Sequence, residues 1–196
     1  RLMYWQVYLH KTSVASEKML ISALLRAKEL AAKGVELFAS PALRFFLCNK
    51  INKDEFYKNP VCLDNFIQLD DNDIWTSLKV WCNHPDIVLS TLSQGLVNRK
   101  LFKVEVLSSP ISPTRKEEIL QKISQQLNIS KKEANYFFST SLIENNMYRK
   151  EDDSIEILFN DGTTQNIADA SDMLNISLLS RKVKKYYVCF LRFNGF

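Results

Sequence analysis

The first 33 residues of this 196-residue chain contain no glycine and no proline, which constrains the fold more than any other feature of the sequence. Apolar side chains recur through this stretch, among them Met3, Val7, Val14, Ile21 and Leu25. Steps of three, four or seven residues keep such side chains on one face of a helix with 3.6 residues per turn. We therefore predict one helix over residues 1–33, about 50 Å long at a rise of 1.5 Å per residue.

The start of this predicted helix lacks a capping residue. Helices usually begin after Ser, Thr, Asp or Asn, whose side chains accept hydrogen bonds from the first N–H groups. Arg1 to Trp5 instead lie within the apolar repeat already, and Arg1 is not an initiator methionine. We therefore expect the chain to be a fragment of a longer protein, with residues missing upstream.

Proline and asparagine divide the next 65 residues into short helical segments. Ser40 and Pro41 predict a helix start, because Ser caps a helix and Pro suits its first turn. Two short helices are expected around 55–57 and 62–69, a longer one contains Ile74, Leu78 and Trp81, and another runs from Pro85 to Asn98. Residues 1–99 are therefore predicted to form an all-helical domain.

The acidic run 70–73, Asp-Asp-Asn-Asp, is compatible with a metal site or with a helix cap. We favour the cap, because acidic and amide side chains at a helix start satisfy backbone N–H groups and the helix dipole.

The hydrophobic period changes to two at residues 102–106, which predicts a half-buried strand. A helix is expected over 113–127, and 136–142 fits a strand or a helix, of which we favour the strand. Residues 155–159 and 163–167 flank an Asn-Asp-Gly turn typical of a hairpin. A short helix at 173–178 and a strand at 186–190 complete the pattern. Residues 100–196 thus predict a small antiparallel α+β domain, of ferredoxin-like type, and the whole chain is α+β.

The residue types limit the chemistry available to this chain. Four glycines leave no phosphate-binding GxxxxGK[ST] loop and no GxGxxG motif. The two histidines, His10 and His84, lie in different predicted helices without ligand partners at useful spacing. We expect no metal centre, no cofactor and no catalytic activity in this chain alone. Four cysteines without CxxC pairing, and no long apolar run, favour a cytoplasmic protein with no membrane partner.

Two segments carry a resemblance to a known family. Tyr8-Leu9-His10-Lys11-Thr12 with Glu17-Lys18-Met19-Leu20, and Asn98-Arg99-Lys100-Leu101-Phe102-Lys103, resemble HD-domain deoxynucleotide triphosphohydrolases, the family of the SAM-and-HD-domain dNTPase. The resemblance implies the C-terminal part of a metal-dependent phosphohydrolase that converts a dNTP into a deoxynucleoside and triphosphate. The divalent metal and the catalytic core would then lie upstream of this chain.

The resemblance also implies roles for five residues. Tyr8 matches a tyrosine that packs against substrate, while His10, Lys11, Arg99 and Lys103 match residues around a regulatory nucleotide, dNTP-like or GTP-like, held between subunits. Four of these residues have a structural alternative. Tyr8 is then a core aromatic, and His10 is a core histidine between Val7 and Val14. Arg99 and Lys103 are then a solvated charged edge.

Two further functions remain open on the sequence. The net charge of +4 and the basic run 181–185 suit a module that binds nucleic acid, although this run also fits charge that keeps the following strand from pairing with other chains. A purely structural dimerisation module is the other alternative. Because the long helix exposes apolar surface, we predict a homo-oligomer in either case.

Overall fold

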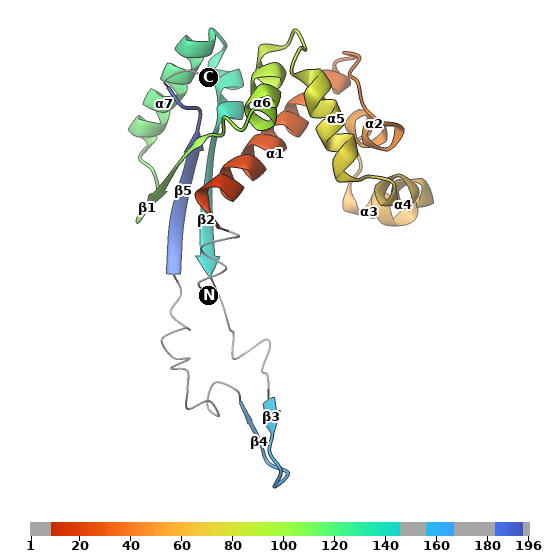
Figure 1. The fold of residues 1–196 in the computed structure, drawn as a ribbon, viewed down its shortest axis with the longest axis vertical. Coiled ribbons are helices and arrows are strands. Elements are labelled where there is room, and N and C mark those ends of the chain that lie inside the picture. The colour runs from red at the N-terminus through yellow and green to blue at the C-terminus, as the bar shows by residue number, and fades with distance from the viewer. Residues whose placement is uncertain (1–8, 146–155, 167–182, 194–196) are drawn as a thin grey trace.

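The structure is a computed structural model, and it describes residues 9–145, 156–166 and 183–193 (Figure 1). A long first helix and five shorter helices precede a small antiparallel sheet, which confirms the predicted α+β fold. The helical half comprises α1 (Lys11–Ala32), α2 (Pro41–Cys48), α3 (Lys53–Lys58), α4 (Pro60–Ile67), α5 (Asp71–Trp81) and α6 (Ile87–Val97). Then follow β1 (Lys103–Leu107), α7 (Pro113–Leu127), α8 (Lys131–Ala134), the 3-10 turn η2 (Asn135–Phe137), β2 (Phe138–Asn145), β3 (Glu156–Leu158), β4 (Thr164–Asn166) and β5 (Val183–Phe190).

The helix α1 begins later than the sequence predicts. His10 is its N-cap, and the His10 Nδ1 atom accepts a hydrogen bond of 3.2 Å from the backbone N–H of Thr12. A single helix that runs unbroken through residues 9 and 10 is therefore wrong, because the imidazole replaces the missing backbone acceptor at the helix start. The side chain of His10 is exposed, so the core-histidine alternative is wrong as well.

The buried face of α1 also differs from the predicted one. Ile21 and Leu25 are 44% and 56% exposed, so the apolar face expected to contain them is not the core face. Ala15, Ala23 and Ala27 belong to the core face instead, and such small side chains allow α6 to pack closely against α1. The buried residues of α1 are Val14, Ala15, Met19, Ala23, Arg26, Ala27 and Leu30.

Side-chain caps start the remaining helices of this half. The acidic run caps α5, as we favoured: the Asp70 carboxylate accepts from the N–H groups of Asn72 and Asp73, and the Asp73 carboxylate accepts from the N–H of Asp70. Ser40 caps α2 in the same way. The helix α6 starts at Ile87 with Asp86 as its cap, two residues later than predicted.

The three-stranded sheet has the order β1-β5-β2, and all pairings are antiparallel. β1 and β2 are therefore parallel to each other, joined through α7, with β5 inserted between them. This split β-α-β arrangement is the unit found in ferredoxin-like folds. β3 and β4 form the predicted hairpin as a separate two-stranded sheet. The predicted helix at 173–178 lies outside the described residues.

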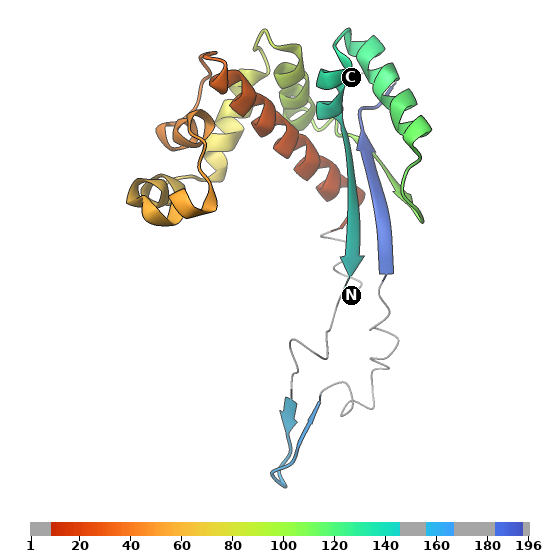
Figure 2. The same cartoon turned by 180° about the vertical axis from the view of Figure 1, so that it is seen from behind.

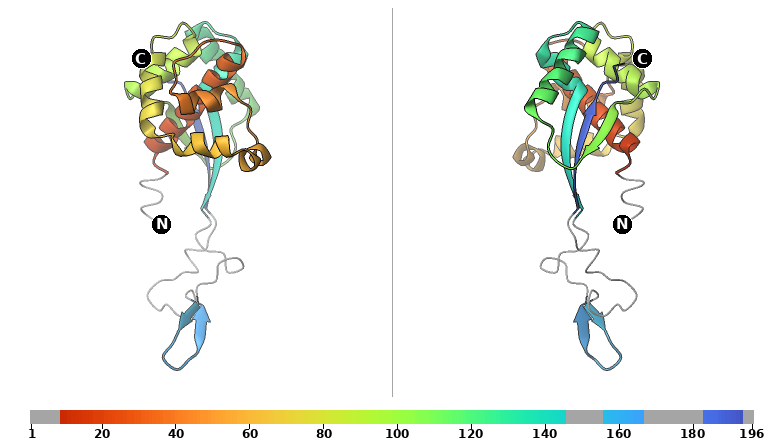
Figure 3. Two further views of the ribbon diagram at one scale, coloured as in Figure 1. Left: turned by 90° about the vertical axis from the view of Figure 1, so that its right-hand side faces the viewer. Right: turned by 90° about the vertical axis from the view of Figure 1, so that its left-hand side faces the viewer.

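Helices cover both faces of the three-stranded sheet (Figures 1 and 2). On one face, Arg115 and Lys116 of α7 reach Glu105 on β1 and the ring of Phe138 on β2. On the other face, the thioether of Met19 on α1 accepts the backbone N–H of Phe102 at 3.3 Å. One hydrophobic cluster consequently extends from α1 through the helices into the sheet. The side views of Figure 3 show the helices gathered around one end of the long strands.

Candidate functional site

A basic cavity of about 460 Å³ lies where the start of α1, the link between α6 and β1, and the residues after β5 meet. Five of its ten lining residues are cationic and none is acidic, although the whole chain carries a net charge of only +4. Three residues that the sequence analysis singled out line this cavity together: Lys11, Arg99 and Lys103. The remaining lining residues are Thr12, Ala15, Lys100, Leu101, Phe102, Val104 and Arg192.

Arg99 occupies a backbone conformation that normally favours glycine. Its φ angle is 57°, in the left-handed region, directly after the α6 C-cap Asn98. The N–H of Lys100 donates to the carbonyl of Gly95 and the N–H of Arg99 to that of Leu96, which closes the helix as a Schellman motif. A non-glycine residue at this position costs about 1 kcal/mol. An arginine that lines a basic cavity therefore occupies a place where glycine would be less strained.

The cations of the cavity differ in how far they are already neutralised. Among the described residues, neither Lys11 nor Arg99 forms an ion pair. The ammonium of Lys103 lies 2.9 Å from Glu105 and 5.6 Å from the centre of the Phe190 ring. Lys103 first and Arg115 second lower the pKa of Glu105, so this carboxylate stays ionised. Lys11 and Arg99 are thus more available to an anionic ligand than Lys103.

The backbone behind the cavity is fixed by buried contacts. Phe102 is 2% exposed, and its ring packs against that of Phe137 with 6.4 Å between centroids. The Nε atom of Arg192 donates to the carbonyl of Leu101 at 3.0 Å, which ties the chain after β5 to the segment before β1. The cations are therefore carried by an ordered frame.

Of the other two predicted site residues, the structure describes His10 but not Tyr8. His10 is not among the lining residues of the cavity, although it immediately precedes Lys11. Because Nδ1 of His10 accepts a hydrogen bond, its neutral ring carries the proton on Nε2, which is then a donor. Tyr8 lies outside the described residues. Its assignment to a substrate pocket stays a prediction.

Sequence reasoning missed Arg192 as a lining residue of the cavity. Arg192 is 93 positions after Arg99, and no local pattern connects them. Only the central position of β5 in the sheet brings the chain after it back to the segment between α6 and β1.

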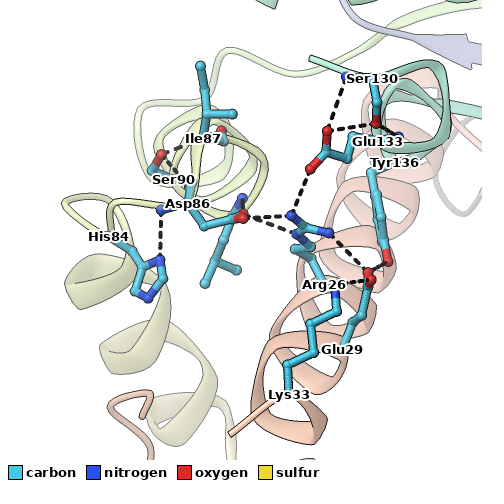
Figure 4. A network of polar contacts seen from close by, with 11 residues as sticks. Arg26, Glu29, Lys33, His84, Asp86, Ile87, Ser90, Ser130, Glu133 and Tyr136 are labelled. Atoms are coloured by element: carbon cyan, nitrogen blue, oxygen red, sulfur yellow. Dashed lines mark hydrogen bonds and ion pairs between the residues drawn. The ribbon is translucent and has the colours of Figure 1, made fainter. Parts of the chain in front are cut away.

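A buried arginine on α1 was also missed. Arg26 is 6% exposed, and Figure 4 shows its guanidinium among carboxylates from three elements. It donates to Asp86 from Nε at 3.1 Å and from Nη2 at 2.6 Å, to Glu29 from Nη1 at 3.0 Å, and to Glu133 from Nη2 at 3.0 Å. Its guanidinium also lies 5.5 Å from the centre of the Tyr136 ring.

The three carboxylates of this cluster all have lowered pKa values. Hydrogen bonds from Lys33 first, and from Tyr136 and Arg26, hold the pKa of Glu29 at about 2. Burial raises the pKa of Asp86, but bonds from Arg26 and the Leu89 N–H outweigh it, so the net shift is downward. Ser130 and then Arg26 lower the pKa of Glu133. All three groups are therefore ionised at neutral pH.

The described residues include no group of three or more His, Cys, Asp or Glu side chains that could hold a metal ion. His84 has a structural contact, because its Nδ1 atom accepts from the N–H of Asp86 at 3.0 Å. In the described part of the chain, no helix has the length and apolar character that crossing a bilayer requires. Of the basic run 181–185, residues 181 and 182 lie outside the described ranges.

Proteins similar to this chain include one of known structure and one known from its sequence. A comparison with models of protein families gave no match. The crystal structure of a phosphohydrolase from Bacteroides thetaiotaomicron is 70% identical over 98% of this chain, with a TM-score of 0.91. The uncharacterised protein YwfO of Bacillus subtilis is 30% identical over 101 residues, 52% of this chain. The chain spans 48% of the length of the Bacteroides protein and 21% of that of YwfO.

Proposed function

We propose that this chain is the C-terminal part of a metal-dependent phosphohydrolase of the HD type, which converts dNTPs into deoxynucleosides and triphosphate. In this proposal the divalent metal and the catalytic residues belong to the part of the enzyme outside this chain. The chain contributes the basic cavity, which binds the phosphates of a regulatory nucleotide, and Tyr8 contributes to the substrate pocket.

The observation that carries the proposal is the likeness to the Bacteroides phosphohydrolase. At 70% identity and a TM-score of 0.91, the two chains share their fold and most of their side chains over this region. The resemblance of Tyr8–Thr12 and of Asn98–Lys103 to dNTP triphosphohydrolases supports nucleotides as the proposed substrate class.

The basic cavity supports the nucleotide-binding part of the proposal. A triphosphate group presents several anionic oxygens within a few ångströms of one another, and arginine and lysine bind such groups through charge-assisted hydrogen bonds. The lining of five cations and no carboxylate complements that charge. A volume of about 460 Å³ lies within the range of small-molecule sites. Lys11 and Arg99, which lack ion pairs within the described residues, are the strongest candidate contacts.

The proposal is tested with full-length protein and each of the four dNTPs in the presence of Mg²⁺ or Mn²⁺. Release of deoxynucleoside together with inorganic triphosphate, measured by chromatography, is the expected result. Release of monophosphate and pyrophosphate would contradict the reaction type, and hydrolysis of other phosphate esters alone would contradict the substrate class.

The salt dependence of binding separates this proposal from the alternative of a nucleic-acid-binding module. Binding of single-stranded DNA that falls steeply with added salt, together with no binding of dGTP or GTP, would favour that alternative. Tight nucleotide binding without strand binding favours the proposal.

A further inference from the structure

Among the residues that the structure describes, Arg26 is the one charged residue that is buried. It stands in the core face of α1 between Ala23 and Ala27, where neighbouring positions carry small apolar side chains. Burying a charge in such surroundings is costly unless the charge is paired and fully hydrogen bonded. The position therefore calls for an explanation beyond packing.

Two of the carboxylates that bind Arg26 are themselves helix caps. Asp86 caps α6 and accepts from the N–H of Leu89 at 2.8 Å. Glu133 completes the capping box of α8 and accepts from the N–H of Ser130 at 3.1 Å. Arg26 thus holds the backbone starts of two helices against α1, one in the helical half and one beside the sheet (Figure 4).

Two of these elements, α1 and α6, lead at their other ends to cations of the basic cavity, and α8 leads to the segment beside a third. The helix α6 ends at the turn that presents Arg99, and α1 begins at Lys11. The helix α8 continues into η2, where the carbonyl of Phe137 accepts the N–H of Leu191 at 3.1 Å, one residue before Arg192. Lys11, Arg99 and Arg192 are therefore each connected to Arg26 through helices or turns that the structure describes.

A direct charge effect of Arg26 on the cavity is small. Fifteen residues of helix, about 22 Å at 1.5 Å per residue, separate Lys11 from Arg26 along α1. The three carboxylates around Arg26 also offset its charge locally, so little net field reaches a group at that distance. Any influence of Arg26 on an anion in the cavity must pass through the position of the helices.

From these contacts we infer that Arg26 is a positioning residue for the basic cavity. By binding the caps of α6 and α8 it sets the spacing of Lys11, Arg99 and Arg192, and thereby the affinity of the cavity for a polyphosphate. The inference rests on the proposed anion-binding role of the cavity and extends it to a residue that touches no ligand.

The test compares Arg26→Lys with wild type in full-length protein, with inorganic tripolyphosphate as the probe and calorimetry as the readout. Lysine keeps the charge but cannot bind Asp86 and Glu133 with a planar fork. We expect tripolyphosphate affinity to fall about 2- to 30-fold, the range for substitutions in coupled networks. The control Lys33→Gln removes a partner of Glu29 on the same helix and should leave affinity unchanged.

A double-mutant cycle separates positioning from general loosening of the fold. If Arg26 acts through the placement of Arg99, Arg26→Lys should cost less affinity in an Arg99→Ala background than in wild type. Equal losses in both backgrounds would overturn the inference. Glu133→Gln, which retains the Arg26–Asp86 pair, replaces Arg26→Lys in the cycle should that variant fail to fold.

The two proposals fail in distinguishable ways. No binding of tripolyphosphate by wild type would overturn the anion-binding role of the cavity and the positioning role with it. Binding that Arg99→Ala weakens but that neither Arg26→Lys nor Glu133→Gln changes would overturn the positioning role alone.

Discussion

Arg26 and Asp86, 60 residues apart in the sequence, are joined by two parallel hydrogen bonds of 3.1 and 2.6 Å, and the same carboxylate caps α6. Asp86 therefore serves two helices at once. It accepts a hydrogen bond from a backbone N–H group at the start of α6, and it neutralises the buried charge of Arg26 on α1.

The double role of Asp86 predicts an unusually costly substitution. Asp86→Ala should lower the free energy of unfolding by about 3 to 5 kcal/mol, because it leaves the buried Arg26 without its main partner. Ser112→Ala, which removes only the cap of α7, should cost about 1 kcal/mol. Urea denaturation of both variants measures the difference, and equal losses would show that the Arg26 contact adds nothing.

The carboxylates around Arg26 predict a loss of stability in acid. Their pKa values are lower in the folded chain than in the unfolded one, so the unfolded state binds more protons as the pH falls. The stabilising contribution is complete above the ordinary values of 4.5 for Glu29 and 3.8 for Asp86 and is lost toward the folded value of Glu29, about 2. Urea denaturation between pH 6 and pH 3 should show this slope.

Glu29→Gln provides the comparison for the acid experiment. Because it removes the carboxylate whose pKa the fold lowers to about 2, the stability of this variant should depend less on pH over this window than that of wild type. An identical slope for the variant would mean that other carboxylates cause the acid sensitivity.

The fold could be predicted from the sequence wherever the signal was local. The cap at Asp70, the Asn-Asp-Gly hairpin and the change of period after Lys100 each follow from neighbouring residues. The core face of α1 could not be predicted from apolar spacing, because close packing with α6 selects alanines over Ile21 and Leu25. Lys11, Arg99 and Lys103 could be singled out because their segments resemble a known family. Arg192 and the Arg26 cluster could not, because they depend on contacts between distant parts of the chain.

The exposed apolar face of α1 bears on the predicted self-association. Leu25 is 56% exposed on α1, and Leu158 on the β3–β4 hairpin is 69% exposed. If α1 forms the contact between subunits, Leu25→Lys should shift the full-length protein toward monomer, and Leu158→Lys should not. Light scattering over a range of concentrations measures this. A monomeric wild type at high concentration would contradict self-association.

Arg99 and Lys103 should contribute differently to phosphate binding. Lys103→Ala removes a cation that Glu105 already neutralises in part, whereas Arg99 forms no ion pair within the described residues. Arg99→Ala should therefore weaken nucleotide binding by about tenfold or more, and Lys103→Ala by less. Glu105→Gln should strengthen binding, because it frees Lys103 from its partner. Calorimetry with dGTP and GTP compares the three variants, and a larger loss for Lys103→Ala would contradict the order.

Arg99→Gly is the most direct test of the basic cavity as an anion site. Glycine suits the φ angle of 57°, so the variant should unfold at the same urea concentration as wild type or a higher one, with a gain of up to about 1 kcal/mol. Asn128→Gly, at another left-handed position that carries a side chain, with a φ of 51°, is the matched control and should leave ligand binding unchanged. The deciding measurement is the affinity of Arg99→Gly for tripolyphosphate. We predict a loss of about tenfold or more in a protein that is at least as stable as wild type, whereas wild-type affinity in the folded variant would contradict the account.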